Sequence, residues 1–85
     1  MPTFEVGLRF DRRDANLLSV LAERARQHEL DPTAAKLFAD SADAARSGEP
    51  LIVICASRTE AIVMADGYLL YGVRRPSIEA LAPGA

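Results

Sequence analysis

The sequence predicts a single α+β domain with the element order β-α-α-β-β-β. Three observations carry this prediction: alternating polarity near the N-terminus, two helical repeats of apolar residues in the middle, and an apolar β-branched run followed by a turn signal in the last third. Two helices packed on an antiparallel sheet would bury these apolar faces together. Residues 1–75 are expected to form the compact domain and residues 76–85 a short C-terminal tail.

The first element is a strand over residues 3–10. The sequence there is T-F-E-V-G-L-R-F, in which the aromatic and aliphatic residues occupy every second position. A period of two is typical of a strand with one buried face. Asp11 follows as the expected N-cap of a helix, and Asp14 is expected to point back at the free amides of its first turn.

Two helices follow. The first is predicted by apolar residues at three- and four-residue spacing and is expected to end near residues 28–30: Leu17, Leu18, Leu21, Ala22 and Ala25. Asp31 and Pro32 then start a second helix, with the proline at its first position. The apolar stripe of this helix is Leu37, Phe38, Ala42 and Ala45. Gly48 and Pro50 predict its end.

The last third predicts a three-stranded meander. Residues 51–55 are apolar throughout, which favours a strand covered on both faces. Residues 61–65 and 68–73 flank Asp66-Gly67, a strong signal for a two-residue hairpin loop, and residues 57–59 are interpreted as a turn. The N-terminal strand is expected either to join this sheet or to pair with its copy across a dimer.

Length and composition indicate the expected oligomeric state and cellular location. The chain has 85 residues, 49% of them apolar, with a formal charge of -2 and one cysteine. Because so short a chain buries little surface and Cys55 has no partner for an internal disulfide, a homodimer is expected to enlarge the core. No apolar stretch approaches the length that spans a bilayer, and no secretory signal is evident, so a cytoplasmic protein without membrane contact is expected.

Catalytic chemistry is not expected. Cys55 and His28 are the only residues of their types, His28 is flanked by polar residues, and the five glycines are scattered. Nucleophilic catalysis requires a base beside the nucleophile, and metal and nucleotide sites require clustered ligands or glycines. The sequence therefore predicts a protein that is not an enzyme and that uses neither a metal nor a cofactor.

Residues 3–47, a strand of alternating polarity followed by two capped helices, resemble the ribbon-helix-helix (Arc/MetJ/CopG-type) DNA-binding domains. The resemblance implies a dimeric transcriptional regulator whose paired strands enter the major groove. It implies that the outward strand residues face base edges, that two arginines at the start of the first helix assist them, and that the start of the second helix faces phosphate. These residues are Thr3, Glu5, Gly7 and Arg9, then Arg12 and Arg13, then Thr33.

The alternative is a protein-binding module or stoichiometric inhibitor with all its strands in one intramolecular sheet. Small phage or mobile-element proteins that block host defence complexes, including anti-CRISPR-like proteins, are of this size and lack catalytic groups. The partner would then be a host protein rather than DNA. The candidate contact residues are Tyr68, Tyr71, Arg74 and Arg75.

Overall fold

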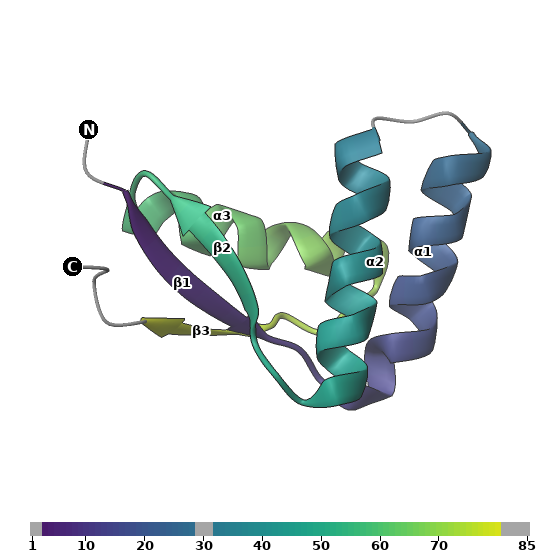
Figure 1. Cartoon of the computed structure of the whole chain (residues 1–85), viewed down its shortest axis with the longest axis horizontal. Helices are drawn as coiled ribbons and strands as arrows, with labels where there is room; N and C mark the ends of the chain where they lie inside the picture. The colour runs from purple at the N-terminus through teal and green to yellow at the C-terminus, as the bar shows by residue number, and fades with distance from the viewer. Residues whose placement is uncertain (1–2, 29–31, 81–85) are drawn as a thin grey trace.

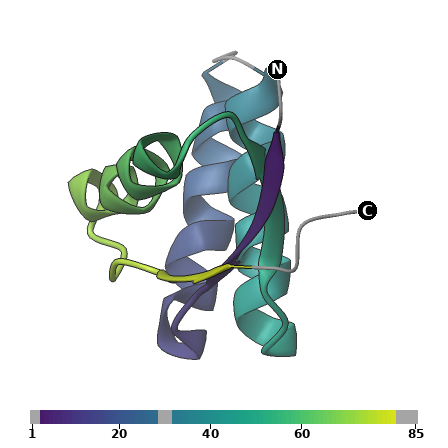
Figure 2. The same cartoon turned by 90° about the vertical axis from the view of Figure 1, so that its left-hand side faces the viewer.

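The computed structural model describes residues 3–28 and 32–80. In chain order the elements are β1 (Phe4–Arg9), the 3-10 turn η1 (Arg12–Asp14), α1 (Ala15–Gln27), α2 (Pro32–Ser47), β2 (Leu51–Cys55), α3 (Arg58–Gly67), the 3-10 turn η2 (Tyr68–Tyr71) and β3 (Ser77–Ala80). Figure 1 shows α1 and α2 as a hairpin at one end of a small sheet, with α3 crossing behind the sheet. Figure 2 shows α3 projecting from one side of the molecule.

The sheet has three antiparallel strands in the order β2-β1-β3. Val6 lies opposite Val53 on one side and Ala80 on the other, and Leu8 lies opposite Leu51 and Ile78. Alternation along the strand therefore turns Val6 and Leu8 toward α3 and the core, while Glu5 and Arg9 are exposed on the other face. The predicted N-terminal strand is confirmed, and it pairs within the chain on both of its edges.

The predicted order β-α-α-β-β-β is wrong, because the order is β-α-α-β-α-β with three helices. Residues 58–67 form α3 and residues 68–71 form η2, where a hairpin around Asp66-Gly67 was expected. The Ser57 side chain caps α3 by accepting a hydrogen bond from the backbone N–H of Glu60 at 3.1 Å. Ala61, Ala65 and Tyr68 are buried at helical spacing, and this burial holds residues 58–71 in helical conformation.

The third strand is also not where the meander placed it. β3 comes from residues 77–80, within the segment expected to be a tail, and it fills the second edge of β1. β2 lies at one edge of the sheet and is covered on one face only, so Ile52 and Ile54 are exposed on the other face. An apolar run alone does not tell a central strand from an edge strand, because neighbouring strands are supplied by distant segments.

The two predicted helices are confirmed as α1 and α2. Asp11 is an N-cap as expected, but of η1, where its carboxylate accepts a hydrogen bond from the backbone N–H of Arg13 at 2.9 Å. Asp14 does not turn back to the first-turn amides. Its carboxylate is buried and accepts hydrogen bonds from the backbone N–H of Arg74 at 3.0 Å and from the Arg74 guanidinium at 2.6 Å.

The core consists of two neighbouring clusters. The larger joins α1 and α2 to the ends of β1 and η2, and includes Leu8, Phe10, Leu18, Tyr68 and Val73. The smaller lies between the sheet and α3 and contains Val6, Cys55 and Ala61. Alanines on the facing sides of α1 and α2 allow the two helices to pack closely. Among the described residues, no helix is both long and apolar enough to cross a membrane.

Candidate functional site

An open apolar groove lies where α2 meets the end of α3 and η2. It has a volume of about 270 Å³. One wall is the exposed side of α2 and the other comes from α3 and η2, and the lining residues are Ala34, Leu37, Phe38, Met64, Gly67, Tyr68, Leu70 and Tyr71. All but the glycine and the two tyrosines have purely apolar side chains or a thioether, so the groove suits an apolar occupant.

Aromatic packing sets the position of the groove. The Phe38 ring of α2 meets the Tyr71 ring edge-on with a centroid separation of 5.1 Å and the Tyr68 ring edge-on at 6.2 Å. Tyr68 in turn packs edge-on against Phe10 at 4.9 Å. These contacts tie η2 to α2 through rings in a favoured geometry, so the two walls are held together by the core itself.

The side chain of Tyr68 forms the floor of the groove. The Tyr68 hydroxyl lies 2.8 Å from the Ser41 Oγ, and that Oγ donates to the backbone carbonyl of Leu37 at 2.7 Å. Burial raises the pKa of Tyr68, and the hydrogen bond with Ser41 opposes this in part. The hydroxyl is thus satisfied inside the protein and leaves the apolar ring to face the groove.

The rim of the groove exposes large apolar side chains. Leu70 is 87% exposed and Tyr71 is also exposed, and both line the groove. Gly72, in the left-handed conformation with φ of 82°, ends η2 and turns the chain back toward the core at Val73. η2 is therefore a short apolar projection beside the groove.

The four residues nominated for protein binding have different surroundings. Both tyrosines line the groove, but Tyr71 is exposed whereas Tyr68 is buried at its floor. Arg74 is bound to the buried Asp14, and Arg75 pairs with Asp66 at 2.5 Å. The two arginines serve intramolecular contacts that hold the segment after η2 in place.

The residues nominated for DNA binding are not gathered on one surface. Glu5, Gly7 and Arg9 lie on β1, and Thr3 lies just before it. Arg12 and Arg13 lie in η1, whereas Thr33 lies in the first turn of α2. In Figure 1 the starts of α1 and α2 are at opposite ends of the helix hairpin. Gly7 is buried, because Pro50 lies so close that a Cβ on residue 7 would come within 3.0 Å of its ring.

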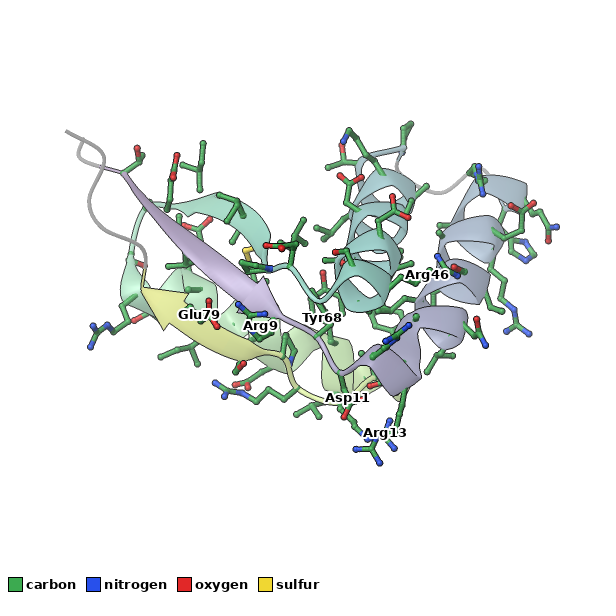
Figure 3. The ribbon with its side chains drawn as sticks, turned by 60° about the horizontal axis from the view of Figure 1, so that its bottom comes forward. Arg9, Asp11, Arg13, Arg46, Tyr68 and Glu79 are labelled. Carbon is green, nitrogen blue, oxygen red and sulfur yellow. The ribbon has the colours of Figure 1, made fainter. Side chains whose placement is uncertain are left out.

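The nominated arginines of this region are largely engaged within the chain. Arg9 donates to Glu79 at 2.6 Å and to the backbone carbonyl of Gly48, and this pairing lowers the pKa of Glu79. Arg13 pairs with Asp11 at 2.8 Å. Figure 3 shows both pairs, Arg9 beside Glu79 on the sheet and Arg13 beside Asp11 below the helix hairpin.

Groups with catalytic chemistry are sparse. Cys55 is buried, and burial together with the nearby charge of Glu60 raises its pKa. Within residues 3–28 and 32–80, no group of three or more His, Cys, Asp or Glu residues could hold a metal ion. The apolar groove is the candidate site that these described residues form.

The sequence does not predict the groove, although two of its lining residues, Tyr68 and Tyr71, are among the nominated contact residues. The stripe containing Leu37 and Phe38 lies on the predicted second helix, but Met64 and Leu70 fall on strands of the predicted hairpin, which is wrong. The missed signal is S-R-T-E at residues 57–60, a Ser-x-x-Glu pattern typical of a helix start. Ser57 does accept from Glu60 N–H, and the Glu60 carboxylate accepts from Ala56 N–H at 3.0 Å.

Comparison with known proteins identifies no relative: no family model, no curated protein and no solved structure matches this chain.

Proposed function

We propose that this protein is a non-catalytic protein-binding module whose groove between α2 and η2 accepts the apolar face of an amphipathic helix of a partner. The observation that carries the proposal is Leu70, whose side chain is 87% exposed at the rim of a groove with apolar walls. Contiguous exposed apolar surface of this kind is costly in water and marks interaction sites. A module of this kind can also inhibit its partner stoichiometrically by covering the helix that it binds.

The construction of the walls favours a helix over an extended peptide. α2, α3 and η2 are all helical, so most of their backbone groups bond within the same element and offer no strand edge for pairing. Recognition then relies on side chains, as when a helix places residues at three- and four-residue spacing into a groove. Met64, Phe38 and Tyr71 supply the adaptable and aromatic surfaces that such contacts use.

DNA binding has less support. A ribbon shared between two subunits needs a free edge on the first strand, and β1 pairs with β2 on one side and β3 on the other. Arg9, the cationic residue of this strand, is already paired with Glu79. Phosphate contacts depend on available Lys and Arg side chains, and here Arg13, Arg74 and Arg75 are also in intramolecular pairs.

The test is selection of binding peptides from a displayed random library against the purified protein. We expect the selected peptides to carry large apolar residues at helical spacing. Leu70→Asp should weaken their binding at least about tenfold, because burying a leucine contributes about 1.5–3 kcal/mol. Val20→Asp is the matched control, since Val20 is an exposed apolar residue on α1 outside the groove, and it should bind like the wild type.

Two results would contradict the proposal. One is equal binding of the selected peptides to the Leu70→Asp and wild-type proteins. The other is a selection that yields no helical apolar peptide while the protein shifts duplex DNA at low salt, which would return the DNA-binding hypothesis to first place.

A further inference from the structure

The outer edge of β2 is unpaired. β2 stands at the end of the strand order β2-β1-β3, so β1 satisfies only one of its two edges. Within residues 3–28 and 32–80, no segment other than β1 forms a hydrogen bond with residues 51–55. The outward N–H and C=O groups of β2 are therefore free to pair with another strand.

The edge also lacks the features that usually prevent pairing. All five residues, Leu51–Cys55, are apolar, with no charge and no proline among them. Ile54 is 67% exposed and Ile52 48% exposed on the face of the sheet opposite α3. β3, the other edge, differs because it carries Glu79 in an ion pair with Arg9. Exposed apolar edge strands are templates for association, and natural proteins normally guard them.

We propose that two copies of this chain associate through antiparallel pairing of their β2 strands about a two-fold axis at Val53. Residues that face each other across a sheet must point to the same side, so in symmetric pairing the axis passes through a residue position. An axis at Val53 is the one that overlaps all five residues of both strands. It places Ile52 of each copy opposite Ile54 of the other, so four isoleucines form one apolar row.

Charges at the two ends of β2 fit this arrangement. Glu49 precedes the strand and Arg58 follows it, both are exposed, and neither takes part in an ion pair within the described chain. The charge of Glu49 is the smallest of the influences that raise the pKa of Arg9. In the antiparallel pair, the start of one β2 lies beside the end of the other, so Glu49 of one copy is near the end from which Arg58 of the other copy follows. The two-fold axis produces this favourable contact twice, whereas a parallel pair would place like charges together.

The resulting dimer would have a continuous six-stranded sheet in the order β3-β1-β2-β2-β1-β3. Its interface shares no residue with the groove between α2 and η2. Dimerisation and peptide binding can therefore fail independently of each other in experiment.

The first test is sedimentation equilibrium over a range of protein concentrations. The wild type should be a dimer, and Ile54→Lys should raise the dimer dissociation constant at least about tenfold, because it places charges opposite the apolar row of the other copy. Val63→Lys is the matched control, since Val63 is 63% exposed on α3 away from β2, and it should dimerise like the wild type. Circular dichroism checks that both variants are folded.

The second test exchanges the charges at the ends of the strand. Glu49→Arg alone and Arg58→Glu alone should each weaken the dimer severalfold, and the double variant Glu49→Arg/Arg58→Glu should restore it. A wild-type protein that remains monomeric throughout the concentration range overturns the proposal. So does a dimer that survives Ile54→Lys unchanged, or a double variant no better than the single ones, since each places the contact elsewhere.

Discussion

At the scale of the residue, Tyr68 connects the core to the groove. Its ring packs against Phe10 and Phe38, and its hydroxyl meets Ser41. Because the Ser41 Oγ donates its proton to the Leu37 carbonyl, the tyrosine hydroxyl acts as donor to Ser41. The sequence predicts Tyr68 as a surface contact because it places this residue on a strand. In the structure Tyr68 lies in the helical turn η2 and points into the core.

Tyr68→Phe tests this hydrogen bond. The variant keeps the ring contacts but leaves Ser41 with a single partner, so the free energy of unfolding should fall by about 1–2 kcal/mol. Tyr71→Phe is the control, because Tyr71 is exposed and its hydroxyl has no hydrogen bond within the described part of the chain. Its effect should stay within about 0.5 kcal/mol. If urea unfolding showed the same loss of unfolding free energy in Tyr68→Phe and Tyr71→Phe, the hydrogen bond with Ser41 would contribute nothing to stability.

The lowered pKa of Asp11 leads us to expect that the stability of the protein depends on pH. The Arg13 side chain and then the Arg13 backbone N–H hold the pKa of Asp11 well below its usual range. A carboxylate with a lowered pKa stabilises the fold above its unfolded pKa of about 4, and this contribution is lost as the pH falls from there toward the folded pKa. Stability should therefore fall as the pH drops below about 5.

Asp11→Asn should reduce that acid sensitivity, because its side chain can still cap η1 but does not titrate. Urea unfolding at neutral and acidic pH measures the difference. Part of the dependence should remain, since pairing with Arg9 also lowers the pKa of Glu79. Asp43→Asn, which removes an exposed carboxylate of α2, should leave the wild-type dependence in place. An unchanged pH dependence in Asp11→Asn would exclude this role.

At the scale of the element, α3 decides the fold. Residues 57–71 carry two conflicting local signals, a Ser-x-x-Glu helix start and an Asp-Gly hairpin turn. The helix prevails because Ala61 and Ala65 pack at helical spacing against the sheet and the hairpin of α1 and α2. Small alanines allow that close packing. The groove exists only because this segment is helical.

Substitution of Gly67 distinguishes a helix from a hairpin turn, because the change in the free energy of unfolding should have opposite signs in the two cases. Gly67 has φ of -58° and open space around its missing Cβ. Gly67→Ala should therefore raise the free energy of unfolding by about 0.4–1 kcal/mol. A hairpin turn would require positive φ at this glycine, and the same change would then destabilise the protein. Gly72→Ala is the comparison, because Gly72 has φ of 82° and should lose about 1–2 kcal/mol.

At the scale of the whole molecule, β1 is the shared centre of the sheet. It receives β2 and β3 from segments about 45 and 70 residues further along the chain, and its inward residues contribute to both core clusters. Ile78 of β3 packs against both clusters. The last strand therefore closes the core, and residues 77–80 are expected to be needed for folding.

Substitutions at two neighbouring positions of β3 test whether this strand is needed to complete the core. Ile78→Asp would place a carboxylate between the two clusters and should cost about 3 kcal/mol or more, enough to unfold much of a marginally stable domain. Ser77→Asp, one position away on the exposed face, should change stability by less than about 0.5 kcal/mol. Thermal unfolding compares them, and similar melting temperatures would show that β3 does not close the core.

The sequence by itself determined those elements whose periodicity agrees with their local capping. β1, α1 and α2 follow from apolar spacing and β2 from a continuous apolar run, with Asp11, Gly48 and Pro50 as start and stop signals. One wall of the groove, with Leu37 and Phe38, follows from the same reasoning. For these segments the local pattern and the final packing favour the same conformation.

Only the tertiary structure decided the conformation of residues 58–71 and the neighbours of β1. In the first case, local signals for helix and hairpin compete, and burial of Ala61, Ala65 and Tyr68 selects the helix. In the second, the partners of Val6 are Val53 and Ala80, and no local pattern specifies contacts at such separations. The exposed edge of β2 follows from the strand order, because no segment pairs with its outer side, and the apolar groove follows from the helical conformation of residues 58–71, because it forms where α2 meets α3 and η2.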